Sequence, residues 1–173
     1  MNDFSDLDGQ ILMKRQPLLS RVLVGLCTLL ALLPTVGGCQ DSKPKMLGIE
    51  GYNYTDRYIH TFDVGGQGGG NVYQSTATSG GGGTYCCIGY NPRRKLPIQM
   101  KVKWTFGYEE DAQGNIVVPN ETHEAVAELR GPVPADPRFL EVHFMPDLTV
   151  QLRITDDRSP PLLVIDRNKA KTP

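Results

Sequence analysis

The feature that most constrains the fold is a strict alternation of apolar and polar residues in the middle of the chain. Between residues 98 and 106 every second side chain is apolar, in the order Ile98, Met100, Val102, Trp104 and Phe106. Successive side chains of a β-strand point to opposite faces, so this pattern predicts a strand with one buried side. A similar alternation spans residues 139–155, where Met145-Pro146-Asp147 predicts the turn of a hairpin.

The remaining elements are weaker but of the same kind. Shorter apolar or β-branched runs predict further strands at residues 57–64, 84–90, 122–129 and 162–165. Residues 121–129 are ambiguous because Glu and Ala are good helix formers. The proline-rich segment 131–138 predicts a loop. No stretch after Cys39 has a sustained helical stripe, so we expect an all-β domain, a small antiparallel sandwich or partly open barrel.

A leader of different character precedes this domain. Basic residues Lys14, Arg15 and Arg21 come before an apolar run at residues 22–33. That run is shorter than the roughly 20 apolar residues of a spanning helix, and the order of segments is that of a helical secretory signal peptide. The first twelve residues are acidic and unlike such a leader, which suggests that translation starts at Met13.

The leader ends in Val36-Gly37-Gly38-Cys39. This sequence resembles the lipobox of bacterial lipoproteins, in which the cysteine is acylated and becomes the new N-terminus. Cys39 is therefore the expected lipidation site, which implies palmitate-type acylation and a membrane anchor. The alternatives are an uncleaved anchor or an ordinary signal peptide with an incidental cysteine. By resemblance to sorted lipoproteins, Gln40 favours the periplasmic face of the outer membrane.

These boundaries give four expected segments. Residues 1–38 are a lipoprotein signal peptide, 39–48 a lipidated tether, 49–167 a single β-rich periplasmic domain and 168–173 a flexible tail. The formal net charge of the whole chain is −1. A nearly neutral domain has no broad positive field, so nucleic acid is not an expected partner.

Two glycine clusters, Gly65–Gly70 and Gly80–Gly83, punctuate the first half of the domain. We favour flexible hairpin tips for both, because glycine alone specifies no ligand. The alternative is that their backbone amides are exposed to bind an anion or a partner.

No catalytic motif is complete. The glycines at 66–70 continue with Asn71 and lack both the helix of a dinucleotide fingerprint and the lysine of a P-loop. His60, His123 and His143 lie on separate expected strands and share no metal-ligand spacing. We therefore expect no enzyme activity, no metal site and no cofactor.

Cys86 and Cys87 are adjacent, and an oxidising compartment favours pairing of exported thiols. Three interpretations stay open: a vicinal disulfide that acts as a rigid loop element, two buried thiols on opposite strand faces, and a reactive redox pair. No basic residue beside them would lower a thiol pKa, which disfavours the third. We expect the pair to contribute to fold or loop shape and to perform no chemistry.

Three stretches together resemble a proteobacterial lipoprotein family of unknown function. They are YNYTDRYIHTFDVGGQGGGNVY (52–73), SGGGGTYCC (79–87) and GPVPADPRFLEVHFMPD (131–147). Some members of that family are similar to immunity proteins of type VI secretion systems. The resemblance implies a periplasmic binding protein that neutralises a lipase-like toxin effector. The alternative is a structural or accessory envelope lipoprotein associated with the secretion machinery.

For a partner-binding module, the expected contact surface is formed by the two glycine clusters and the proline-rich loop. Its candidate anchors are six tyrosines: Tyr52, Tyr54, Tyr58, Tyr73, Tyr85 and Tyr90. Tyrosine offers a large contact area and a hydroxyl group at low entropic cost. The competing explanation is that half or more of these rings pack against the sheet.

Overall fold

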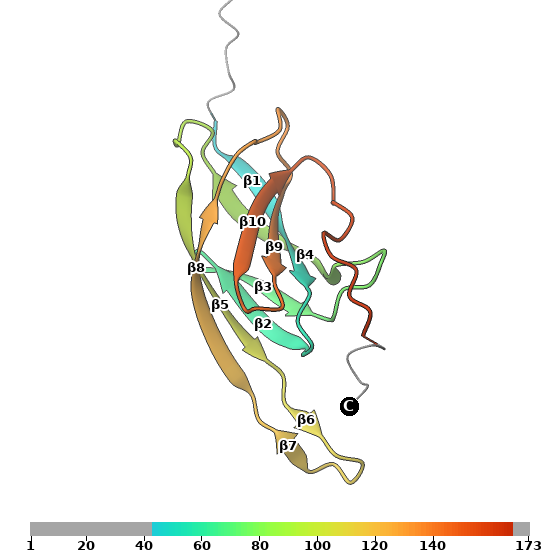
Figure 1. Ribbon diagram of the computed structural model, residues 1–173. Helices are drawn as coiled ribbons and strands as arrows, with labels where there is room; N and C mark the ends of the chain where they lie inside the picture. Colours follow the sequence, from blue (N-terminus) through green and yellow to red (C-terminus); the bar gives the residue numbers. More distant parts are fainter. Residues whose placement is uncertain (1–42, 168–173) are drawn as a thin grey trace, which may run out of the picture. The chain divides into compact units, whose positions relative to one another are not determined.

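A computed structural model describes residues 43–167 and shows an all-β domain without a helix in that part of the chain (Figure 1). Its strands are β1 (Lys45–Asn53), β2 (Ile59–Val64), β3 (Gln67–Val72), β4 (Gly81–Tyr90), β5 (Ile98–Phe106), β6 (Glu109–Glu110), β7 (Ile116–Val118), β8 (Glu121–Leu129), β9 (Phe139–Phe144) and β10 (Val150–Thr155). The all-β prediction is confirmed, and the ambiguous segment 121–129 is a strand. The predicted signal peptide, Cys39, Gln40 and the tail 168–173 lie outside the described residues.

Eight of the strands close into a barrel in the order β1-β4-β3-β2-β5-β8-β10-β9, and β6 pairs with β7 in a separate two-stranded sheet. The barrel is complete, so of the two expected architectures it is the barrel that forms. Most neighbours are antiparallel, but β1 pairs with β9 in parallel, and so does β10 with β8. Among residues 43–167 no helix is long and apolar enough to cross a membrane.

Residues 98–106, with their alternating apolar and polar side chains, form the predicted strand with one buried face, β5. β5 pairs with β8 from Ile98–Leu129 to Phe106–Glu121 without a register shift. Val102 and Trp104 are 0% and 2% exposed and belong to the single apolar core inside the barrel. Their neighbours Lys101 and Lys103 point to solvent. Because the side-chain period of a strand is two, this register places one complete face in the core.

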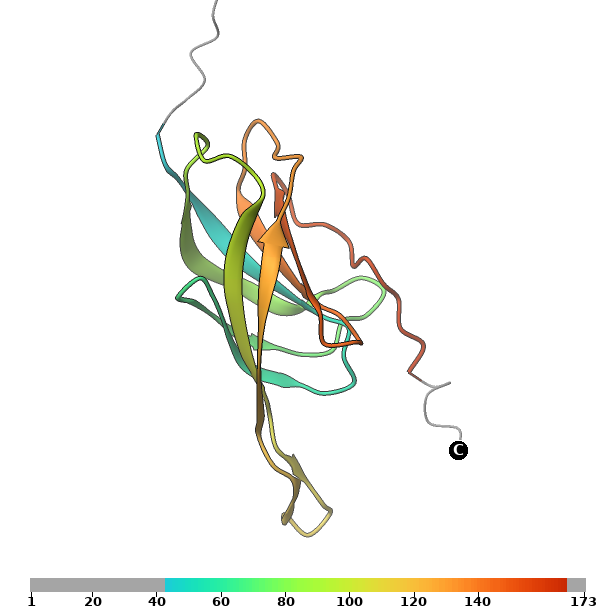
Figure 2. The same ribbon diagram turned by 60° about the vertical axis from the view of Figure 1, so that its left-hand side comes forward.

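The two ends of the barrel differ. At the N-terminal end, where β1 begins, lie the β4–β5 loop (residues 91–97) and the proline-rich loop 131–138 (Figures 1 and 2). At the opposite end the β6–β7 hairpin projects beyond the barrel, as both views show. We call residues 107–120 the arm, and this end of the barrel the arm end.

Three local predictions are wrong. Residues 45–48, assigned to the tether, already belong to β1. Residues 162–165 form no strand, and the N–H of Leu162 donates to the Tyr54 hydroxyl and not to a neighbouring strand. The glycine clusters are not flexible tips, since most of their residues lie within β3 and β4.

The glycines are required for space. A Cβ on Gly69 would lie 1.9 Å from Cζ of Phe62, and one on Gly70, whose φ is +74°, would lie 2.1 Å from Cζ of Tyr85. Aromatic rings therefore pack directly on the glycine backbone of β3, where any larger residue would collide with them.

The last described segment, residues 156–167, packs against the barrel. After β10 it turns back and runs along the outside of β1 and β9, from the N-terminal end towards the arm end (Figure 1). We call this segment the strap.

Candidate functional site

The structure separates the six candidate tyrosines into two groups. Tyr52, Tyr54 and Tyr90 are 2%, 1% and 9% exposed. Tyr85 is half-buried, and its hydroxyl donates to Oδ1 of Asn71 over 2.8 Å. These four rings pack on the barrel, as the competing explanation expected. Tyr73 differs because it is 61% exposed, and the half-buried Tyr58 lies beside it.

Tyr52 and Tyr54 belong to a buried polar cluster on the outer face of β1 and β9. Both rings stack on His143, whose centroid lies 4.4 Å from that of Tyr52 and 5.9 Å from that of Tyr54. His143 Nδ1 is 3.1 Å from the Tyr54 hydroxyl, and His143 Nε2 is 3.3 Å from Oε2 of Glu141. His143 and Glu141 are both 0% exposed. A buried carboxylate needs such partners, since an unpaired one is strongly destabilising.

The strap supplies further partners of this cluster. The backbone N–H of Ser159 donates to Oε1 of Glu141 over 2.8 Å, and the carbonyl of Ser159 accepts from the Tyr52 hydroxyl over 2.8 Å. The backbone N–H of Leu162 donates to the Tyr54 hydroxyl, also over 2.8 Å. If Tyr54 then donates to Nδ1 and Nε2–H donates to Glu141, every group in the chain of contacts is satisfied.

Two arginines hold the ends of the strap. Arg158 forms an ion pair with Glu50 over 3.5 Å, contacts Thr84 and lies over the ring of Phe139. Arg167 donates to the backbone carbonyls of Ser75 and Thr55 over 2.7 and 3.1 Å. The strap is therefore fixed along its length, and it closes this face of the barrel to solvent.

The pKa values follow from this burial. Burial, together with the negative charge of Glu141, raises the pKa of Tyr52 well above its ordinary value. Burial also raises the pKa of Tyr54. Burial acts to raise the pKa of Glu141 as well, but hydrogen bonds from His143 and Ser159 outweigh it, and the net pKa lies below its ordinary value. The cluster thus holds a carboxylate among neutral phenols.

The exposed aromatic residues gather at the arm end. Tyr58 and Tyr73 have ring centroids 4.8 Å apart, and the rings of Tyr58 and His60 meet in a T-shaped arrangement with centroids 6.3 Å apart. Tyr58, His60 and Tyr108 line a surface cavity of about 320 Å³ beside the base of the arm. Tyr73 and Tyr108 are 61% and 54% exposed. We call Tyr58, His60, Tyr73 and Tyr108 the aromatic patch.

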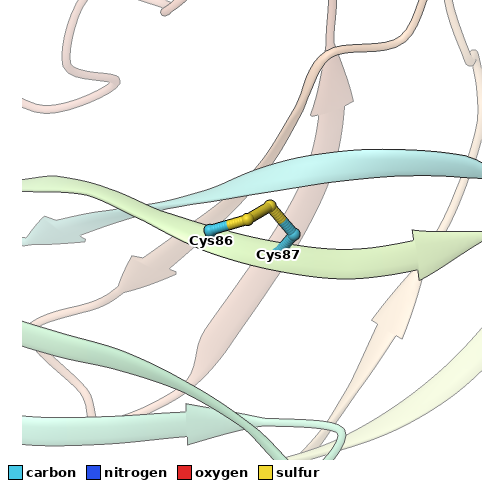
Figure 3. Close-up of a disulfide and its surroundings, with 2 residues drawn as sticks. All are labelled: Cys86 and Cys87. Atoms are coloured by element: carbon cyan, nitrogen blue, oxygen red, sulfur yellow. A yellow bond between two sulfur atoms is a disulfide. The ribbon is translucent and has the colours of Figure 1, made fainter.

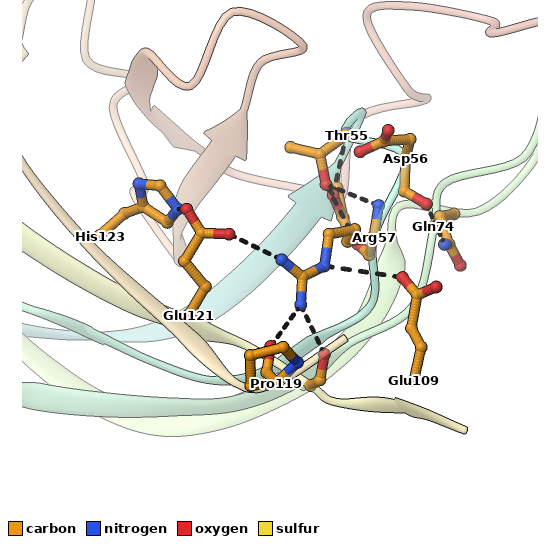
Figure 4. A network of polar contacts seen from close by, with 10 residues as sticks. Thr55, Asp56, Arg57, Gln74, Glu109, Pro119, Glu121 and His123 are labelled. Carbon is orange, nitrogen blue, oxygen red and sulfur yellow. Dashed lines mark hydrogen bonds and ion pairs between the residues drawn. The ribbon is translucent and has the colours of Figure 1, made fainter. Parts of the chain in front are cut away.

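Arg57 fixes the arm next to this patch (Figure 4). Its Nη2 donates to the backbone carbonyls of Gly107 and Pro119, both over 3.0 Å, and so ties the two strands of the arm together at its base. Its Nη1 donates to Oε2 of Glu121 over 2.7 Å. The guanidinium also lies over Phe106, 5.1 Å from the ring centroid. Such a planar fork is the geometry in which arginine differs from lysine.

One nitrogen of Arg57, Nε, is buried without a hydrogen bond. It lies 3.6 Å from Oε1 of Glu109, close enough for an ion pair only. Beyond this base the arm presents both charge and apolar surface. Ile116 and Val117 are 61% and 57% exposed, and the opposite strand carries Glu109 and Glu110. Exposed apolar side chains grouped on a projecting hairpin mark a contact surface more often than scattered ones do.

Cys86 and Cys87 lie next to each other in β4 (Figure 3). Their sulfur atoms are bonded to each other, and the peptide between the two residues is cis. Cys86 is exposed and Cys87 is half-buried. The pair is therefore part of a strand rather than of a loop, and its role stays a prediction.

Sequence reasoning missed Tyr108, Arg57, Glu141 and the role of His143. The alternation of residues 139–144 places Glu141 and His143 on the outer face of the barrel. The sequence pattern predicts that this face is exposed to solvent, because it does not show that the strap covers it. The expected surface itself is not assembled, because the proline-rich loop lies at the N-terminal end and the exposed tyrosines lie at the arm end.

The fold and these surfaces define a small closed β-barrel module with an aromatic patch at its surface and a covered polar face. A family model described as protein of unknown function, DUF3304, matches residues 52–152, which is more than half of the chain. The chain belongs to this family. Neither the curated proteins nor the solved structures contain a significant match.

Proposed function

We propose that this protein is a lipid-anchored periplasmic binding module that acts without catalysis. Its partner is proposed to be a lipase-like effector of a type VI secretion system, which the protein neutralises as an immunity protein. The observation that carries the binding role is the aromatic patch beside the rigidly anchored arm. The choice of partner is supported by the family resemblance, and the lipid anchor by the Val36-Gly37-Gly38-Cys39 sequence.

The geometry of the patch suits a protein partner. Tyrosine and other aromatic residues are enriched at the centres of protein interfaces, where they contribute much of the binding energy. Tyr58 and Tyr73 already pack against each other, so little side-chain freedom is lost on binding. Arg57 holds the arm in one position before the partner arrives, which lowers the cost further.

The non-catalytic role is supported by how the acid–histidine pairs are used. Glu141 and His143 are inaccessible beneath the strap. Glu121 Oε1 lies 2.8 Å from Nε2 of His123, outside hydrogen-bond geometry, while the other oxygen of the same carboxylate binds Arg57. In the described part of the chain no group of three or more His, Cys, Asp or Glu side chains could hold a metal ion.

Deletion of the gene, followed by co-culture with a type VI-armed parent, tests the function. We expect the deletion strain to be killed on contact and to be rescued by the wild-type gene. Rescue by a Tyr58→Ser, Tyr73→Ser double variant should fail at equal protein level. A Tyr85→Phe variant is the matched control and should rescue, since Tyr85 packs on Gly70. Survival of the deletion strain equal to that of the parent would contradict the immunity role.

The anchor has its own test. Cys39→Ser should abolish labelling with a palmitate analogue, because serine cannot form the thioether that carries the lipid. Cys27→Ser, a change within the leader, is the control and should leave the label intact. Equal labelling of wild type and Cys39→Ser would show that Cys39 is not the site.

A further inference from the structure

A second cavity lies at the N-terminal end of the barrel, far from the aromatic patch. Its volume is about 330 Å³, at the lower end of the range of about 300–1,000 Å³ that is usual for small-molecule sites. Inward-facing apolar side chains from the ends of several strands line it, among them Leu47, Ile88, Ile98, Leu129 and Ile154. The mouth of an eight-stranded barrel is a common place for one small ligand.

The cavity exists because the β2–β3 hairpin is short. Its turn ends beside Lys101, whose carbonyl accepts from the N–H of Gly65 over 2.8 Å. The ladder between β3 and β4 consists of a single residue pair, Val72 with Gly82. β4 continues to Tyr90 with a ladder to β1 alone, so its last residues face the start of β5 without a strand between them.

The rim of the cavity offers one available cation. Both Arg94 and Lys101 contribute to the lining. Lys101 Nζ lies 2.8 Å from Oε1 of Glu124 and is already paired. Arg94 is exposed, and its guanidinium has no hydrogen bond or ion pair with the described residues. It lies in the β4–β5 loop between Arg93 and Lys95, so the rim is basic.

We propose that this cavity binds an anionic amphiphile with a single alkyl chain and a carboxylate or phosphate head group. The chain enters the apolar cavity, where its transfer from water is favourable. The head group stays at the rim and accepts hydrogen bonds from Arg94, whose planar fork matches a carboxylate or a phosphate. The site does not depend on the toxin partner proposed above, because the aromatic patch lies at the other end of the barrel.

Calorimetric titration with alkanoates of increasing length, each below its micelle concentration, tests the proposal. The whole barrel lies within the compact unit of the chain that begins at residue 41, so residues 41–173 are the protein to use. From octanoate to decanoate to dodecanoate, each two added methylenes should tighten binding about tenfold until the cavity is filled. Dodecyltrimethylammonium, with the same chain and a cationic head, should bind at least about tenfold more weakly than dodecanoate. An affinity that does not depend on chain length or on head-group charge would overturn the proposal.

Two variants separate the site from a general attraction to the basic loop. Arg94→Gln should weaken dodecanoate binding about tenfold. The matched control Arg93→Gln removes the same charge next to it but does not line the cavity, so it should change affinity less than about twofold. Equal losses in the two variants would overturn the site.

A filling variant and a map of the site complete the test. Met100→Trp should abolish binding by occupying the cavity. Should that variant fail to fold, amide shifts of the wild type on adding dodecanoate decide instead. Shifts at Gly65, Gly89 and Asn91 support the site, and shifts confined to the aromatic patch refute it. Phosphatidylglycerol vesicles then distinguish the source. Binding to vesicles that Arg94→Gln weakens more than Arg93→Gln, without binding of monomeric dodecanoate, would overturn the single-chain ligand in favour of a two-chain lipid of a bilayer.

Discussion

Two surfaces of this barrel are built from the same residue types, tyrosine and histidine, and differ in what covers them. Beneath the strap, Tyr52 and Tyr54 stack on His143 and bury their hydroxyls in hydrogen bonds. At the arm end, the exposed ring of Tyr73 packs on the half-buried ring of Tyr58, and no later segment covers Tyr73. The first arrangement fixes the strap over the barrel and excludes solvent, whereas the second leaves apolar area at the surface, where a partner could bind.

The comparison shows that a tyrosine-rich segment does not identify a binding surface. Tyr52, Tyr54 and Tyr58 lie within seven consecutive residues, yet Tyr52 and Tyr54 are buried and Tyr58 is only half-buried. The covering segment decides the difference, and it comes from more than a hundred residues later in the chain. Substitutions on the covered face should therefore cost stability, and those on the open face should cost binding.

The largest effect is expected from His143→Ala. The variant removes the partner of a fully buried carboxylate and leaves a cavity between two rings. We expect a loss of about 3 kcal/mol in the free energy of unfolding, measured by urea denaturation. His60→Ala removes the same ring from the aromatic patch and should change stability by less than about 0.5 kcal/mol. Similar losses in both variants would break the distinction between the covered and open faces.

The next effect concerns the support of the open face. Arg57→Lys keeps the charge but cannot hold Gly107, Pro119 and Glu121 together. We expect a loss of about 1–2 kcal/mol and faster amide hydrogen exchange in residues 107–120. Arg93→Lys, on an exposed loop, is the control and should leave both quantities unchanged. Unchanged exchange in the arm of Arg57→Lys would mean that the arm is held by its own hairpin.

Much of the barrel follows from sequence, and the reasons for the failures are physical. Strands with one solvent-exposed face, such as β5 and β10, can be predicted because apolar and polar residues alternate along them. β1 does not, because both of its faces are covered, by the core and by the strap, so its polar residues are buried as well. β3 is composed largely of glycine, so it has no alternation of apolar and polar side chains from which a strand could be predicted. The aromatic patch combines residues that lie in or next to three different strands, β2, β3 and β5, and the closed barrel brings them together.

Acidification should act on the covered face and spare the open one. The folded-state pKa of Glu141 lies below its ordinary value of 4.5, so the carboxylate contributes stability that is fully present above that pH. This contribution is lost as the pH falls through the folded-state pKa. Urea denaturation between pH 6 and 3 should show a smaller decline for Glu141→Gln than for the wild type. Parallel declines would indicate that other carboxylates, such as Asp147, whose pKa is also lowered, dominate acid unfolding.

The smallest change in stability is expected on the open face itself. Tyr73 is 61% exposed, and its ring contact is with Tyr58 alone among the aromatic residues of the described chain. Tyr73→Ser should therefore lower the free energy of unfolding by less than about 0.5 kcal/mol. Its effect on partner binding should be at least about tenfold, since a tyrosine at the centre of an interface is typically worth more than 1 kcal/mol.

Tyr54→Phe is the matched comparison on the covered face. It removes only a hydroxyl, but one that connects Leu162 to His143, and should lower stability by about 1–2 kcal/mol while leaving partner binding intact. A titration of both variants against a purified effector of the class proposed above, with urea denaturation in parallel, measures the two quantities. Loss of binding by Tyr54→Phe in a folded protein would make the strap, rather than the aromatic patch, the contact surface.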